Sequence, residues 1–192
     1  MTTASRAEAG LRLFRTFAAS TIILALAACG GAGERPAEQQ RPATVRRPPP
    51  PVSRGAAPSD ASFVAANASI DLFVIRSSEL ALQRSSSPRV RDFASTLIAA
   101  HKGTSAQLSL AGRRLNLLPS ATLLPGEQAM LDALQASSRF DAEFVRDQRL
   151  VHQQAVALDS AYAARGRSPT LRPVAAAALP IEQRHLRLLA YL

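Results

Sequence analysis

The sequence predicts an all-α protein, built as a four-helix bundle with a short extra helix. Beyond residue 60 the chain is rich in Ala and Leu, and its apolar residues recur at three- and four-residue steps. The Asn-Gly and Asp-Gly pairs that close β-hairpins are absent. Residues 61–192 are enough for one ordinary domain, so we expect a single bundle in this segment.

A serine-rich break separates the first two long helices. We expect the first helix from about Asp60 to Arg84, with Asp60 as its N-cap. Ser87 followed by Pro88 is typical of a helix start, and this second helix should end near Asn116. The positions predicted to face the core are Phe63, Ala66, Ile70, Phe73 or Val74, Ser77 and Leu80 in the first helix, and Val90, Phe93, Leu97, His101, Leu108, Ala111 and Leu115 in the second.

The remaining helices complete the bundle. A short helix is predicted over Pro125–Ala136, and a third long helix over about Ser138–Ala164, ended by Gly166. Ser168-Pro169 repeats the Ser-Pro start and opens the last helix, in which we expect a kink at Pro180. Four long helices with compact connections favour a four-helix bundle. The predicted core-facing positions are Phe140, Phe144, Val145, Val151, Val156, Leu158 and Tyr162 in the third long helix, and Leu171, Val174, Ala178, Ile181, His185 and Leu188 in the last.

Residues 1–28 have the build of a secretory signal peptide. Three arginines precede an apolar run from Phe17 to Ala28, which is shorter than the about 20 residues that a membrane-spanning helix needs. The run leads into Leu26-Ala27-Ala28-Cys29, which resembles the bacterial lipobox, and Cys29 is the only cysteine of the chain. The resemblance implies cleavage before Cys29 and lipidation of its sulfur.

A lipidated Cys29 implies a protein of the cell envelope that is held to the membrane by its lipid. In many lipoproteins, Asp directly after the lipidated cysteine favours retention at the inner membrane. This chain has Gly30 at that position, which points to the periplasmic face of the outer membrane. Residues 29–60 are rich in Pro and lack apolar periodicity, so we expect a disordered linker.

The formal net charge of +9 comes mostly from arginine. Arginine binds phosphate and carboxylate groups, which favours an anionic envelope surface or an unknown envelope protein as partner. Nucleic acid is not expected, because acidic residues alternate with the basic ones, Trp is absent and the chain is predicted to be exported.

The globular segment resembles the bacterial domain of unknown function 4142. The matching positions, in chain order, are Phe63-Val64, Ser86-Ser87-Pro88 with Val90 and Phe93-Ala94, His101, Phe140-Asp141, His152, Leu179-Pro180 and His185-Leu186. The resemblance covers about residues 63–192. It implies an exported, often lipid-anchored protein with a ferritin-like four-helix bundle, in a family without an established activity.

The three histidines of the chain each fall on a different long helix, at His101, His152 and His185. Imidazole is the commonest metal ligand in proteins. Glu182 precedes His185 by three residues, so the two side chains share a helical face, the spacing that ferritin-like bundles use for metals. These residues predict a metal site in the bundle core, with Asp71 of the first helix as a further acid.

The structural alternative is that the histidines only make hydrogen bonds in the core. Glu182 would then lie at the helix surface near Arg184 or Arg187. The family carries Asp just before the histidines of its second and third helices, and this chain has Ala100 and Val151 there. A di-iron site needs several inward carboxylates, so the shortage of acids favours a protein without a cofactor.

Two functions therefore remain open from the sequence. It contains no Gly-x-Ser-x-Gly elbow, no phosphate-binding loop and no His-Glu-x-x-His motif. The favoured interpretation is a cell-envelope lipoprotein whose non-catalytic bundle has an interaction or structural role. The alternative is a ferritin-like periplasmic protein that binds iron, zinc or copper, or an oxidoreductase.

The lipobox predicts that Cys29 carries the lipid. In bacteria grown with a labelled fatty acid, the full chain should take up label and Cys29→Ala should not, because that variant lacks the acceptor sulfur. Gel fluorography of the two purified chains makes the measurement. Equal labelling of both chains, or none in the wild type, would contradict the prediction.

Overall fold

The computed structural model describes residues 57–192, and the predicted signal peptide, Cys29 and nearly all of the linker lie outside the described residues. The described part contains only helices, in the order α1 (Asp60–Arg84), α2 (Pro88–Arg113), α3 (Pro125–Ala136), α4 (Phe140–Arg165), α5 (Arg172–Leu188) and a 3-10 turn η1 (Leu189–Tyr191). Among them, none has the length and apolar character needed to cross a bilayer.

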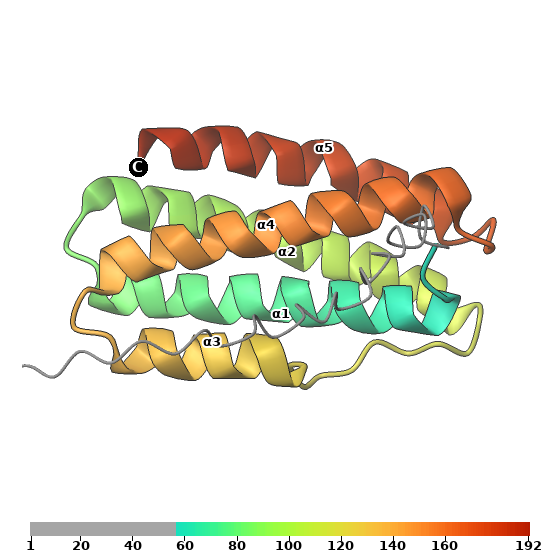
Figure 1. Cartoon of the computed structure of the whole chain (residues 1–192), viewed down its shortest axis with the longest axis horizontal. Coiled ribbons are helices and arrows are strands. Elements are labelled where there is room, and N and C mark those ends of the chain that lie inside the picture. Colours follow the sequence, from blue (N-terminus) through green and yellow to red (C-terminus); the bar gives the residue numbers. More distant parts are fainter. Residues whose placement is uncertain (1–56) are drawn as a thin grey trace, which may run out of the picture. The chain divides into compact units, whose positions relative to one another are not determined.

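The helices pack as two antiparallel pairs (Figure 1). Helix α1 packs along α2, α4 packs along α5, and contacts of α1 with α4 and of α2 with α5 join the pairs. Residues 114–124 and α3 carry the chain back to the end where α2 begins, so α2 and α4 run in the same direction. The short α3 packs outside the bundle, on α1 and α4. The predicted all-α bundle with a short extra helix is confirmed.

Serine hydroxyls set the starts of the first two helices. The α1 cap is Ser59, whose hydroxyl accepts the backbone N–H of Ser62 at 3.1 Å. The expected cap Asp60 is therefore wrong by one residue, and Asp60 instead accepts the hydroxyl of Tyr162 at 2.5 Å. Ser87 caps α2 as predicted, with Pro88 in the first turn.

Two predicted boundaries differ in the second half of the bundle. Helix α4 begins at Phe140 rather than near Ser138. Helix α5 begins at Arg172, because the Ser168 hydroxyl accepts the backbone N–H groups of Thr170 and Leu171 and forms a turn ahead of the helix. Gly166 ends α4 as expected.

The interior of the bundle is apolar at its two ends and polar between them. One apolar cluster is centred on Phe73, Phe93, Leu97, Phe144 and Val151, and the other on Phe63, Val64, Leu108, Tyr162 and Leu171. Between them lie buried polar side chains from all four long helices, among them Asp71, His101, His152, Asp159, Glu182 and His185. We call this level of the bundle the polar layer.

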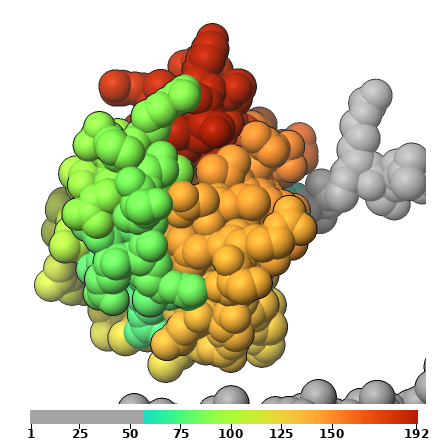
Figure 2. All heavy atoms as spheres, turned by 90° about the vertical axis from the view of Figure 1, so that its left-hand side faces the viewer, coloured from blue at the N-terminus to red at the C-terminus, as the bar shows by residue number. Residues whose placement is uncertain are grey.

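The C-terminus closes the bundle at the end where α2 begins. Figure 2 shows the C-terminal segment, in red, against the first part of α2, in green. The Arg89 guanidinium donates to the carbonyl of Tyr191, and Arg149 of α4 donates to the carbonyl of Leu189 at 3.2 Å. Leu189 itself is buried in the first apolar cluster, so this end of α5, with His185 one turn before it, is held between α2 and α4.

Candidate metal centre

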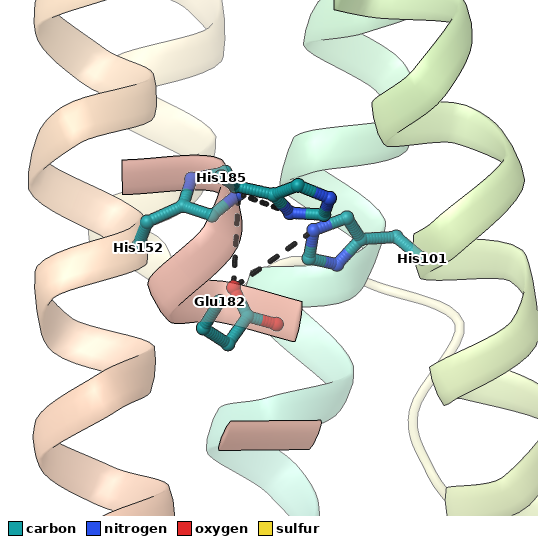
Figure 3. Close-up of side chains that lie close together, drawn as sticks. All are labelled: His101, His152, Glu182 and His185. Atoms are coloured by element: carbon teal, nitrogen blue, oxygen red, sulfur yellow. Dashed lines mark hydrogen bonds and ion pairs between the residues drawn. The ribbon is translucent and has the colours of Figure 1, made fainter. Parts of the chain in front are cut away.

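Four side chains converge in the polar layer (Figure 3): His101 from α2, His152 from α4, and Glu182 and His185 from α5. Each offers one atom that can bind a metal, and these atoms all lie within 4.8 Å of one another. All four residues are at most 3 % exposed. The i, i+3 spacing of Glu182 and His185 puts both on the inner face of α5, as the sequence predicts.

The distances among the four atoms suit a single small ion. His152 Nε2 lies 3.1 Å from His185 Nδ1 and 3.6 Å from Glu182 Oε2, and His101 Nε2 lies 4.0 Å from the same oxygen. In a four-coordinate site with bonds of about 2.0 Å, neighbouring ligand atoms lie about 2.8 Å apart in a square plane and about 3.3 Å apart in a tetrahedron. The arrangement is therefore close to that of a four-ligand site, with His101 slightly retracted.

Asp71 orients the His101 ring from behind. The His101 Nδ1–H donates to Asp71 Oδ1 at 2.8 Å, which leaves Nε2 facing the other three ligand atoms. The Asp71 carboxylate also accepts the hydroxyls of Thr104 at 2.9 Å and Ser105 at 3.0 Å. A carboxylate behind an imidazole fixes its tautomer and makes the free nitrogen a better metal ligand. Asp71 thus supports a candidate ligand and lies outside the group of four.

His152 is oriented by the backbone of its own helix. Its Nδ1–H donates to the carbonyl oxygen of Gln148 at 2.7 Å, so its Nε2 is the free nitrogen that faces the centre. The Gln148 side chain donates to the Ser77 hydroxyl at 2.7 Å, and Ser77 donates to the carbonyl of Phe73. This chain of hydrogen bonds ties α4 to α1 at the level of the candidate centre.

His185 is the ring that must change most when an ion binds. Its Nδ1 faces His152 Nε2, which is an unprotonated acceptor, so without an ion His185 Nδ1–H donates the hydrogen bond. The Phe93 ring packs nearly perpendicular to the His185 ring, with centroids 6.3 Å apart. Binding an ion through Nδ1 would move this proton to the other ring nitrogen.

Two of the four candidate ligand atoms are buried without any hydrogen bond. Within residues 57–192, neither His101 Nε2 nor Glu182 Oε2 has a partner. A buried polar atom without a partner is unfavourable, and such atoms are rare in folded proteins. The two lie 4.0 Å apart, so one ion between them would satisfy both.

The same burial shifts the pKa values of the centre. Burial raises the pKa of Glu182 to about 7, with the charge of His101 opposing the shift and that of Asp71 adding to it. Burial lowers the pKa of His185 to about 4 and that of His152 well below its ordinary value, and the charge of His101 adds to both. Burial also lowers the pKa of His101, but its hydrogen bond to Asp71 and the charges of Glu182 and Asp71 outweigh this, and the net shift is upward.

Asp159 is a polar-layer residue that the sequence did not reveal. It is 1 % exposed, its Oδ1 accepts the amide of Asn67 at 3.2 Å, and its Oδ2 has no partner among the described residues. Burial raises its pKa to about 7, and the charges of Glu182 and Asp71 add to the shift. Asp159 follows His152 by seven residues, two helical turns, and this spacing is the signal that could have placed it on the inner face of α4.

The sequence-predicted residues are thus partly brought together. His101, His152, His185 and Glu182 form one group, and the alternative of a surface position for Glu182 is wrong because the residue is buried there. Thr104 and Ser105 were missed as supports of Asp71. They follow His101 at helical spacing, which was the available signal.

Residues 46–192 match the family described as domain of unknown function (DUF4142). The chain belongs to this family. The resemblance expected from the spaced sequence positions is therefore confirmed for the DUF4142 domain. No curated protein matches the sequence significantly.

Two solved structures share the helical fold of the DUF4142 domain. CopM in its Cu(II)-bound form is 21 % identical with a TM-score of 0.59, and the match covers 69 % of this chain and 94 % of CopM. A DUF305 fragment from Deinococcus radiodurans is 18 % identical with a TM-score of 0.60, and the match covers 70 % of this chain and 95 % of the fragment. At these identities the likeness shows a common fold.

Asp159 gives the metal-free protein a pH dependence that one substitution isolates. The folded state keeps the Asp159 proton up to about pH 7, whereas the unfolded chain loses it near about pH 4. The Asp159 contribution therefore weakens the wild type as pH rises through this window, by up to about 1.4 kcal/mol per pH unit. The amide that replaces the carboxyl group in Asp159→Asn does not titrate. The unfolding free energy of the variant minus that of the wild type should therefore increase from about pH 4 to about pH 7.

Urea unfolding of both chains at several pH values, with chelator present, measures that difference. Above about pH 7 the difference should level off, because Asp159 is then ionised in both states. A difference that stays constant across the window would show that the Asp159 carboxyl is not protonated in the folded state.

Proposed function

We propose that this DUF4142 protein binds a divalent transition-metal ion, with copper(II) as the preferred ion, through His101, His152, Glu182 and His185. The observation that carries the proposal is the pair of buried ligand atoms without partners, His101 Nε2 and Glu182 Oε2. They face the same point as the remaining two ligand atoms of the group. Of the two functions that the sequence leaves open, this geometry supports metal binding better.

The charges of the polar layer also support an ion. Asp71 and Glu182 place two carboxyl groups beside one histidine with a raised pKa, and the layer is almost fully buried. A buried carboxylate is stable when it is paired or coordinates a metal. A divalent ion bound to Glu182 would supply the missing positive charge, and the hydrogen bonds behind His101 and His152 already hold their free nitrogens toward it.

The donor atoms favour copper(II) or zinc over the other first-row ions. Three imidazole nitrogens and one carboxylate oxygen suit these two metals, and copper(II) binds most tightly in the usual order of divalent ions. None of the four residues offers sulfur, which copper(I) prefers. CopM, a protein of the same fold, matches in both a Cu(II)-bound and a Cu(I)-bound form, so this likeness supports copper without favouring one oxidation state.

Four protein ligands favour binding without catalysis. Structural metal sites are filled by protein side chains, whereas catalytic sites keep one position open for water or substrate. The group of four would fill a four-coordinate site, so we propose a role in holding or carrying the ion. This agrees with the non-catalytic bundle expected from the sequence.

The proposed location of the protein depends on its N-terminal segment. If Cys29 is lipidated, the domain would hold its ion outside the cytoplasmic membrane, on the periplasmic face of the outer membrane. There it would bind metal that enters the envelope. The interaction role, the lipid anchor and this location remain predictions from the sequence alone.

Removal of two ligands tests the proposal. The full chain carrying Cys29→Ser, so that no thiol competes, should bind about one Cu²⁺ per chain, and the His101→Ala/His152→Ala double variant should bind none. Elemental analysis after gel filtration gives the stoichiometry. Electron paramagnetic resonance should show nitrogen coupling in the wild type.

Gln153→Ala is the matched control, because Gln153 is exposed on α4 beside His152. It should bind Cu²⁺ like the wild type. Bound metal should also raise the melting temperature of the wild type and the control, but not that of the double variant. Copper retained by the double variant would contradict the proposed site, and a wild type without bound metal would contradict the function.

A further inference from the structure

The candidate centre is enclosed, so an ion needs a way to reach it. The four ligand residues are at most 3 % exposed, and the apolar clusters lie on both sides of the polar layer. A usable metal site requires a path from solvent. Such a path must touch at least one of the four ligand residues.

One internal cavity does so. It has a volume of about 10 Å³ and is lined by residues of all four long helices, among them Asn67, Asp71, Thr104, Asp159, Val174 and Glu182. This space holds the centre of about one water molecule, and a bare transition-metal ion is no larger. Asn67 and Val174 are partly exposed, and Glu182 is a ligand of the candidate centre. The lining therefore includes both residues that reach the protein surface and a ligand of the centre.

Asp159 lines this cavity with a carboxylate oxygen that no hydrogen bond in the described part of the chain explains. Its Oδ1 is engaged by Asn67, but its Oδ2 is buried and unpartnered among the residues that the structure describes. No salt bridge within residues 57–192 involves it. An ionisable group buried beside a small cavity without a counter-charge is a candidate binding group for a cation.

We propose that this cavity is the passage of the metal ion, and that Asp159 is a transient ligand between the surface at Asn67 and the centre at Glu182. The proposal rests on the proposed metal-binding function. An ion that enters would exchange water for the Asp159 carboxylate and then pass to Glu182 Oε2, which has no partner to displace. An ion that leaves would follow the same steps in reverse.

A passage residue affects the rates of uptake and release together. Asp159→Asn keeps the shape of the side chain and removes its charge, so Cu²⁺ uptake and release by the full chain with Cys29→Ser should both slow by about tenfold or more. Stopped-flow mixing at about pH 8 follows uptake by the visible absorption of bound Cu²⁺. Excess chelator then measures release.

Asp147→Asn is the matched control. Asp147 lies on the same helix, is 2 % exposed and also has an unpartnered Oδ2, but it pairs with Arg146 and does not line the cavity. Its two rates should change by less than about twofold. Ala178→Val adds bulk to the cavity lining without a change of charge, and should slow both rates as Asp159→Asn does.

The outcomes separate the passage from the metal site. Unchanged rates in Asp159→Asn would overturn the passage and leave the metal site standing. Slower uptake with faster release would also overturn it, since Asp159 would then only hold the bound ion by its charge. A wild type that takes up no Cu²⁺ would overturn the proposed function, and the passage with it.

Discussion

The hydrogen bond from His101 to Asp71 anchors the polar layer around which the bundle is built. Two long apolar helices could pack by hydrophobic contact alone, but here each long helix also buries polar atoms at one level. Asp71 of α1 gathers His101, Thr104 and Ser105 of α2, so the first helix pair is joined by a charged acceptor. Since buried polar groups are stable only when satisfied, these contacts fix how the helices are aligned along their length.

The second helix pair, α4 and α5, faces His101 with atoms that can bind a metal. His152 of α4 is held by the carbonyl of Gln148, and His185 and Glu182 of α5 reach toward it and toward His101. The hydrogen bonds behind the His101 and His152 rings are complete, whereas the atoms that face one another are partly unsatisfied. An ion bound at that point would satisfy them, which is why the same layer that aligns the helices is the proposed functional site.

The fold was predictable because helical periodicity and Ser-Pro starts are local signals. The bounds of α1 and the start of α2 follow from Arg84, Ser87 and Pro88. The residues of the site were predictable, whereas their hydrogen bonds and their separate roles were less so. Helical spacing placed His101 and His185 inside, and the metal-site hypothesis added His152. The hypothesis also assigned Asp71 to the ligands, because spacing does not tell a ligand from the carboxylate behind it. Asp159 was missed because charged residues are rarely buried, although its spacing of seven residues from His152 could have placed it on the inner face of α4.

The direct measurement of the central claim is X-ray absorption at the copper edge of the full chain loaded with one equivalent of Cu²⁺, in the Cys29→Ser background. The account predicts a shell of nitrogen and oxygen atoms at about 2.0 Å, with the outer scattering of about three imidazole rings and no sulfur. A spectrum without imidazole scattering, or one with a sulfur ligand, would contradict the assignment of the polar layer as the metal centre.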